Sequence, residues 1–231
     1  MSLPLRARRP SRPGGGPGPP GRRSRVRRIS NVAIGTVTAV ALCTGTWLLS
    51  GGAASHAPPQ PSAAQAGGGQ EGEGPGAPAL SPSPPDRIAI PSIRVDAPLM
   101  GLRLTSSGSL DVPPAAKKNL AGWYEAGTTP GERGTAVVAG HVDNSEGPAV
   151  FYDLGAVKKG ALIDVERRDG SVAVFTVDAV EVYRARDFPD AKVYGAAQRP
   201  ELRVITCGGG YTRGTGYQGN VVVFAHLTGS R

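Results

Sequence analysis

The sequence predicts an all-β domain over residues 86–231, built as a sandwich or barrel from many short strands. Short runs rich in valine and isoleucine recur at close spacing, and Gly and Pro separate them. Asp169-Gly170 lies between two such runs and is a strong hairpin signal, because a type I′ turn needs positive φ at both positions. Convincing helical periodicity is scarce, and no internal repeat is present. With about 140 residues, the domain is large enough to bury one core.

The expected elements follow from these runs. Strands are expected over residues 87–90, 93–95, 135–139, 161–166, 171–177, 178–183, 202–206 and 220–225. Pro91 interrupts the first two, which suits an edge or a bend. Short helical turns are expected near residues 115–120, 151–154 and 191–197.

The N-terminal tail accounts for the positive charge of the chain. Residues 1–28 contain nine arginines and no acid, whereas the rest has 17 basic and 18 acidic residues, a net charge of −1. The overall charge of +8 therefore says nothing about the folded part. The tail has no aromatic residues and no nucleic-acid-binding motif, so we expect no nucleic-acid partner.

Residues 29–49 follow this tail and have no charged side chain. As a helix they span about 31 Å, enough to cross a bilayer core. Arginines directly before a membrane segment favour a cytoplasmic N-terminus. We therefore expect a single-pass signal anchor at 29–49, a cytoplasmic tail at 1–28, and a domain on the extracellular side of the membrane. A cleaved signal peptide, with Ser55-His56-Ala57 at the cleavage site, is the alternative.

Residues 50–85 separate the anchor from the domain. Glycine and proline supply 16 of the 35 residues from 51 to 85, and Leu80 is the only large apolar residue there. Such a composition buries too little apolar surface to order itself, so a disordered linker is expected.

Cys207 and His141 are the candidate catalytic pair. Cys207 is the only cysteine of the domain, and Cys43 lies in the membrane segment, where it cannot reach it. A free thiol is unusual outside the cell, where thiols tend to pair as disulfides. Nucleophilic catalysis by cysteine needs at least a thiol and a nearby base, usually an imidazole, that generates the thiolate. The alternatives are a buried cysteine that acts as a small hydrophobe, and a hydrogen-bonded core histidine.

Four motifs in order resemble one family. They are Gly122-Trp123-Tyr124, the run from Gly134 to Asp143 that contains Gly140-His141-Val142-Asp143, then Thr206-Cys207-Gly208-Gly209, and the apolar run from Asn220 to Ala225. In this order, behind a membrane anchor, they resemble a sortase, most closely class F. The resemblance covers nearly all of residues 86–227 and implies a closed eight-stranded β-barrel.

The resemblance also implies a mechanism. Sortases are cysteine transpeptidases that act on a C-terminal sorting signal of the LPXTG type, typically in Gram-positive bacteria. Cys207 would attack the carbonyl after the threonine of the signal, and His141 would protonate the departing amine. An amine of a cell-wall precursor, or water, would then resolve the thioacyl enzyme.

The chain departs from the family pattern at one position. Sortases place an arginine on or just before the last strand to stabilise the oxyanion, and in class F it commonly stands in a Tyr-Arg-Asp-Asn run. Here the run reads Tyr217-Gln218-Gly219-Asn220, so glutamine replaces the charged group. Arg213, in the loop between the last two strands, is the nearest substitute, and we assign it the role by resemblance.

Other residues have two interpretations each. His226 is a candidate base but is more typical of a strand end, and Asp143 could orient His141 or make a local turn. Trp123 and Tyr124 could line a substrate groove or belong to the core. No metal-ligand cluster and no phosphate-binding glycine loop is present, so we expect no cofactor, although a calcium site from scattered acids stays open.

Two further functions compete with the transpeptidase. One is an envelope cysteine hydrolase or L,D-transpeptidase, although the Ser/His-Gly-Cys pattern of the latter is absent. The other is an inactive sortase-like binding module, which Gln218 suggests.

Overall fold

The computed structural model describes residues 57–66, 76–106, 108–214 and 216–231. The expected cytoplasmic tail and the expected membrane segment at 29–49 both lie outside these ranges. Within the described ranges, no helix has the length and apolarity needed to cross a membrane.

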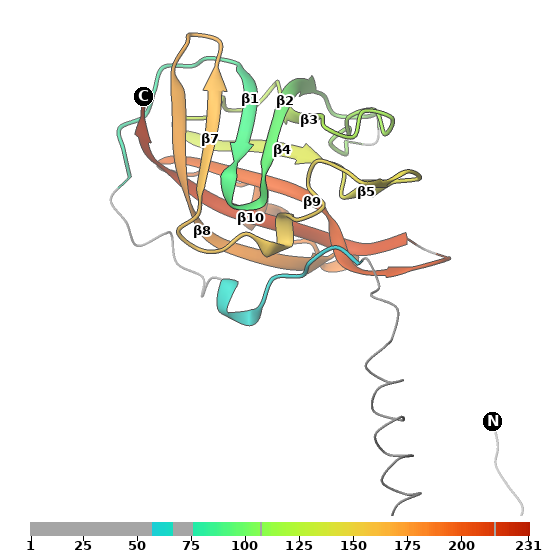
Figure 1. Ribbon diagram of the computed structural model, residues 1–231. Coiled ribbons are helices and arrows are strands. Elements are labelled where there is room, and N and C mark those ends of the chain that lie inside the picture. Colours follow the sequence, from blue (N-terminus) through green and yellow to red (C-terminus); the bar gives the residue numbers. More distant parts are fainter. Residues whose placement is uncertain (1–56, 67–75, 107, 215) are drawn as a thin grey trace, which may run out of the picture. The chain divides into compact units, whose positions relative to one another are not determined.

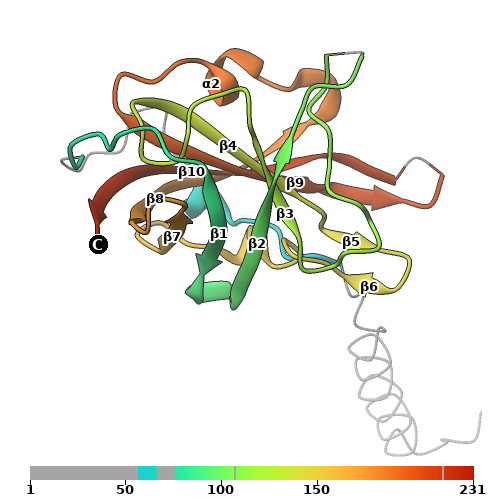
Figure 2. The same cartoon turned by 90° about the horizontal axis from the view of Figure 1, so that it is seen from above.

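Eight strands form a closed barrel in the order β1-β2-β3-β4-β9-β10-β8-β7, and β1 pairs with β7 to close it (Figures 1 and 2). The barrel strands are β1 (Pro85–Ile90), β2 (Val95–Leu102), β3 (Ala121–Tyr124), β4 (Gly134–Gly140), β7 (Leu162–Arg167), β8 (Val172–Arg184), β9 (Pro200–Thr212) and β10 (Gly216–Ser230). The prediction of an all-β, closed eight-stranded barrel is confirmed. The strand β3 was not expected, because Ala121 to Tyr124 is short and contains a glycine.

The remaining elements are short, and all of them except η1 (Ala63–Gln65), which precedes β1, lie between the barrel strands along the chain. Two residues each form β5 (Asp143–Asn144) and β6 (Gly147–Pro148), which pair as a small separate hairpin. The helical pieces are η1, η2 (Pro91–Ile93), η3 (Leu154–Ala156), η4 (Ala185–Asp187) and α2 (Asp190–Tyr194). Helical turns are confirmed near residues 151–154 and 191–197, whereas residues 115–120 form no helix.

The hairpin predicted at Asp169-Gly170 is present between β7 and β8, but the predicted turn type is wrong. Gly170 has φ of 84°, whereas Arg94 is the only non-glycine residue of the described ranges with positive φ. The Arg167 N–H donates to Ser171 O at 2.9 Å, so three residues form the loop. A three-residue loop with glycine in the left-handed region suits this pair, and the Asp169 carboxylate accepts the Ser171 N–H at 3.0 Å.

The barrel interior is a continuous apolar core. Its fully buried side chains include Phe151, Phe175, Ile88, Leu202 and Leu227, which come from five different parts of the chain. Alternate residues of the long strands supply it, because successive side chains of a strand point to opposite faces.

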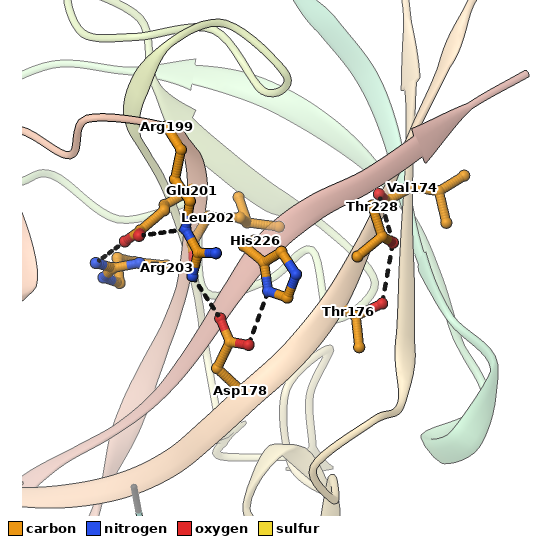
Figure 3. A network of polar contacts seen from close by, with 9 residues as sticks. All are labelled: Val174, Thr176, Asp178, Arg199, Glu201, Leu202, Arg203, His226 and Thr228. Atoms are coloured by element: carbon orange, nitrogen blue, oxygen red, sulfur yellow. Dashed lines mark hydrogen bonds and ion pairs between the residues drawn. The ribbon is translucent and has the colours of Figure 1, made fainter. Parts of the chain in front are cut away.

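A second apolar cluster and a polar network cover the outside of the β8-β10-β9 sheet. The cluster contains Val137, Ile205, Val222 and Phe224 with Val193 of α2. Beside it, Asp178 pairs with His226 and Arg199, and Glu201 pairs with Arg199 and Arg203 (Figure 3). Buried charges are costly unless they are paired, and here they form ion pairs.

Two parts of the expected linker contact the barrel. The side-chain oxygen of Gln60 accepts the Gly209 N–H at 3.2 Å, and that of Gln65 accepts the Lys159 N–H at 2.9 Å. Pro58 is buried, and Gly155 lies so close to the Pro59 carbonyl that an added Cβ would be 2.0 Å from its oxygen. Specific hydrogen bonds and close backbone approach therefore order residues 57–66, which composition alone does not reveal.

Candidate active site

Two parallel strands bring the backbones of His141 and Cys207 close together: His141 directly follows β4, and Cys207 lies within β9. β4 and β9 are parallel neighbours, and their last paired residues are Ala139 and Ile205. One residue further on each strand, the Thr206 hydroxyl donates to Gly140 O at 2.8 Å in a buried position. His141 and Cys207 are the next residues, so adjacent strands, which lie about 4.8 Å apart, position the two predicted catalytic groups side by side.

Cys207 is a free, exposed cysteine in the wall of a cavity. Desolvation by the surrounding protein, and then the negative charge of Asp143, raise the pKa of its thiol. The thiol is therefore the prevailing form at neutral pH, whereas the thiolate is the nucleophile. A base beside Cys207 is needed to remove the proton when the sulfur attacks.

His141 is half-buried and held by the backbone. Its Nε2 lies 2.6 Å from Pro113 O, and a carbonyl oxygen can only accept a hydrogen bond. Nε2 therefore has the proton in the neutral ring, which leaves Nδ1 to accept and donate the proton in a reaction. Pro113 O takes the place of the carboxylate that often orients a catalytic histidine.

Asp143 contacts Tyr217 and not His141. The Tyr217 hydroxyl donates a short hydrogen bond to Asp143 Oδ2, which links β5 to β10. Burial and this carboxylate raise the pKa of Tyr217, so the phenol stays protonated and continues to donate. In the described residues no hydrogen bond joins Asp143 to His141, so the interpretation that Asp143 orients His141 has no support from a direct contact.

A cavity of about 640 Å³ lies beside Cys207. Its wall includes Val137, Ala139 and Ile205 from β4 and β9, together with Leu104 and Tyr194. Among the described lining residues two are acidic, Asp111 and Asp190, and none is lysine or arginine. The cavity is thus an apolar groove of a size suited to a short peptide.

The two aromatic candidates, Trp123 and Tyr124, lie in different environments. Tyr124 lines the cavity, whereas Trp123 is buried in the barrel core. Neighbouring strand residues point to opposite faces, so only one of the two reaches the groove.

Asn220 is a site residue that the sequence analysis did not single out. It is the direct partner of Cys207 in the antiparallel pair of β9 and β10, and it lines the same cavity. Directly opposed side chains in such a pair lie on one side of the sheet, with Cβ atoms about 5 Å apart. Counting both strands back from the turn pairs Asn220 with Gly208, and only the bulge between Tyr217 and Gly219 brings Asn220 opposite Cys207.

Arg213 and Gln218 lie farther along the hairpin. Arg213 follows the last residue of β9, Thr212, is exposed, and is not part of the cavity wall. Gln218 is exposed, and its amide donates to the Thr212 hydroxyl at 2.8 Å. The assignment of Arg213 to the oxyanion stays a prediction, and Asn220 is the polar side chain closest to Cys207 by register.

The strand expected over residues 202–206 is longer than predicted, because the glycines after Cys207 do not end it. β9 continues through them to Thr212, because β10 goes on pairing with it. Gly209 and Gly210 have φ of 77° and 94°, which a residue with a Cβ adopts rarely, and they let the hairpin bend beyond Cys207.

His226 belongs to the polar network and not to the cavity. Its Nδ1 lies 2.7 Å from Asp178 Oδ1, and its side chain is 5% exposed (Figure 3). It therefore has a structural role. In the described part of the chain, no group of three or more His, Cys, Asp and Glu could hold a metal ion.

Comparison with known proteins identifies the family to which the barrel belongs. The Sortase domain family matches residues 88–228, which is more than half of the chain. The chain therefore belongs to the sortase family, whose members are cysteine transpeptidases, and it is an enzyme of that kind. No curated protein matches it.

Several solved sortases are similar to this chain. Sortase A from Listeria monocytogenes is 20% identical, with a TM-score of 0.47, and the match covers 63% of this chain and 87% of that one. Sortase A from Corynebacterium diphtheriae is 21% identical, with a TM-score of 0.49, over 64% of this chain and 63% of that one. Sortase C1 from Streptococcus suis is 18% identical, with a TM-score of 0.48, and the match covers 64% of this chain and 74% of that one.

Proposed function

We propose that this chain is a membrane-anchored transpeptidase. It cleaves an LPXTG-like sorting signal and transfers the secreted protein that carries this signal to an amine of a cell-wall precursor. The observation behind the proposal is the placement of His141 directly after β4 and of Cys207 on the neighbouring strand β9, beside an apolar groove. The proposed catalytic residues are Cys207, His141 and an oxyanion donor.

Acylation uses the groove and the pair together. The signal lies in the groove, and the Cys207 sulfur attacks the carbonyl carbon of its threonine while the thiol proton passes to His141 Nδ1. The C–N bond to glycine then breaks, and the same nitrogen returns the proton to the departing amine. The products of this step are a thioester on Cys207 and a free amine.

The negative oxygen of the tetrahedral intermediate needs a donor. Asn220 faces Cys207 and has a side-chain amide, which makes it the best-placed donor for this oxygen. Arg213 would bring a full positive charge, but it would have to fold back from the end of the hairpin.

Transfer reverses the same chemistry. The acceptor amine attacks the thioester carbonyl, a new amide bond forms, the C–S bond breaks, and His141 accepts the proton of the amine. Water gives hydrolysis in place of transfer. Residues 29–49 would anchor the chain, with the N-terminus in the cytoplasm and the barrel facing the cell wall.

The test uses the full chain in detergent with a fluorogenic LPXTG peptide and triglycine as the acceptor, followed by mass spectrometry. We expect cleavage between Thr and Gly, a triglycine-ligated product, and a thioacyl adduct on Cys207. The Cys207→Ala variant should form none of these. Cleavage with hydrolysed product alone at saturating triglycine would favour the hydrolase, and no cleavage across a panel of signals would favour the binding module.

A further inference from the structure

The Asp143–Tyr217 contact lies beside the catalytic pair but outside the peptide groove. Asp143 stands two residues after His141, and Tyr217 stands three residues before Asn220 on β10. Neither His141, Asp143 nor Tyr217 is part of the 640 Å³ cavity wall, which ends at Gly140 and Cys207 on this side. The contact therefore lies on a side of Cys207 that the groove does not occupy, and Asp143 is close enough to affect the pKa of the thiol.

That side is where the acceptor has to arrive. While the sorting signal is attached to Cys207, its acyl chain fills the groove, so the second substrate approaches past His141. An α-amine has a pKa near 8 and is mainly an ammonium ion at neutral pH. It therefore has to bind as a cation and lose a proton before it attacks.

Asp143 is suited to such a cation. Its Oδ2 accepts the Tyr217 hydroxyl, whereas Oδ1 has no hydrogen-bond partner in the described ranges. The half-buried Tyr217 ring packs against Tyr211 with centroids 5.2 Å apart, which fixes the phenol. A carboxylate held on one oxygen and open on the other can accept a charge-assisted hydrogen bond from an ammonium.

The structure also leaves space beyond Asp143. Pro148 is its cross-strand partner in the β5–β6 hairpin, and Pro148 lines a second cavity of about 480 Å³. Tyr152 lines that cavity too and lies close enough to Tyr217 to affect its pKa. The body of an acceptor with its amine at Asp143 would have room there.

We propose that Asp143, held by Tyr217, binds the ammonium group of the acceptor amine next to the Cys207 thioester. This inference rests on the proposed transpeptidase function and adds the recognition of its second substrate. The ammonium hydrogen-bonds to Asp143 Oδ1 and gives one proton to the neutral His141. The resulting amine attacks the thioester carbonyl, the amide forms, and its second proton passes to the Cys207 sulfur as the C–S bond breaks, so the products are the amide, the Cys207 thiol and a protonated His141 that releases its proton to water.

The test compares two acceptors at about pH 7, triglycine, which is mainly cationic, and hydroxylamine, which is uncharged. Both resolve the same thioester, so the ratio of their ligation efficiencies cancels any change in acylation. With Asp143→Asn in the full chain, the triglycine-to-hydroxylamine ratio should fall about tenfold, because an isosteric amide removes the charge. Tyr217→Phe keeps the ring and should lower the ratio by about threefold.

The control is Glu146→Gln, which removes the same charge from an exposed position on the same hairpin and should leave the ratio unchanged. An unchanged ratio in both Asp143→Asn and Tyr217→Phe would overturn the proposal. If Asp143→Asn lowers the yields of both products in equal proportion, Asp143 acts by positioning His141 and not by binding the acceptor, and this result would also overturn the proposal. If the wild type forms no thioacyl adduct with the signal peptide, the proposed transpeptidase function itself fails. This outcome is distinguishable from failure of the acceptor-binding proposal, which is measured by the product ratio.

Discussion

Asn220 faces Cys207 directly across the antiparallel pair of β9 and β10, and both side chains form part of one cavity wall. The arrangement places an amide donor beside the carbonyl that the sulfur attacks, on a strand and not on a loop. Groups on strands keep their positions better than groups at a hairpin end.

Asn220→Ala should lower kcat/KM for the fluorogenic signal peptide by about 100-fold, because removing one oxyanion donor costs this order of rate. Asn220→Asp should lower it further, since a negative charge would face the negative oxygen. Arg213→Ala should change it by less than about threefold, as expected for an exposed side chain away from the site. A large loss with Arg213→Ala and a small one with Asn220→Ala would return the role to Arg213.

Cys207 should react faster with a vinyl sulfone as the pH rises through neutrality. Burial and Asp143 raise its pKa, and only the thiolate reacts, so the reactive fraction keeps growing above pH 7. Asp143→Asn removes a negative charge, lowers that pKa and should increase the rate at neutral pH. Asp143 and Tyr217 are the titratable groups that interact electrostatically with the thiol. Mass-spectrometric alkylation rates measure the effect, and a slower Asp143→Asn variant would contradict it.

Gly140→Ala should damage both stability and activity. A Cβ there would lie 2.7 Å from Cδ2 of the fully buried Phe151, so the ring has to move. We expect a loss of about 2 kcal/mol in the free energy of unfolding, and at least about a tenfold loss of activity because His141 is the next residue. Gly214→Ala, where a Cβ would meet nothing, is the control and should be neutral in urea unfolding.

Asp178→Ala should destabilise the barrel without affecting the thiol. The change leaves the buried His226 without the partner of its Nδ1 and weakens the hold on Arg199 (Figure 3). We expect a loss of about 3 kcal/mol in the free energy of unfolding and an unchanged alkylation rate of Cys207. Asp164→Ala breaks a pair with the exposed Arg231 and should cost less than about 1 kcal/mol. Equal losses for the two variants would contradict this account of the network.

The residues predicted an all-β sandwich or barrel because strands are local signals, and the family resemblance implied the closed eight-stranded barrel. Valine-rich runs, Gly and Pro at the turns, and the Asp169-Gly170 hairpin each report on neighbouring residues. Their placement of His141 after one strand and Cys207 on another is also local, and the family motifs supplied the strand order. What the residues could not supply was β3, whose pairing with β2 and β4 forms a strand from a run with little β-propensity of its own.

The site details that were missed depend on register and on distant contacts. The bulge near Gly219 decides that Asn220, and not Val221, stands opposite Cys207. The Pro113 carbonyl that holds His141 is 28 residues away in sequence. Backbone groups leave no residue-type signal, so composition and motifs cannot indicate them.

The Gln60–Gly209 hydrogen bond joins residues 57–66 to the strand of the nucleophile, two residues after Cys207. Any tension on the chain ahead of residue 57 would therefore reach this bond and the buried Pro58 before it reached β1. A protein that is tethered on one side and joined to a substrate on the other experiences such a pull. In this barrel the mechanical load would enter at the active-site strand, so force on the tether and chemistry at Cys207 share one short stretch of backbone.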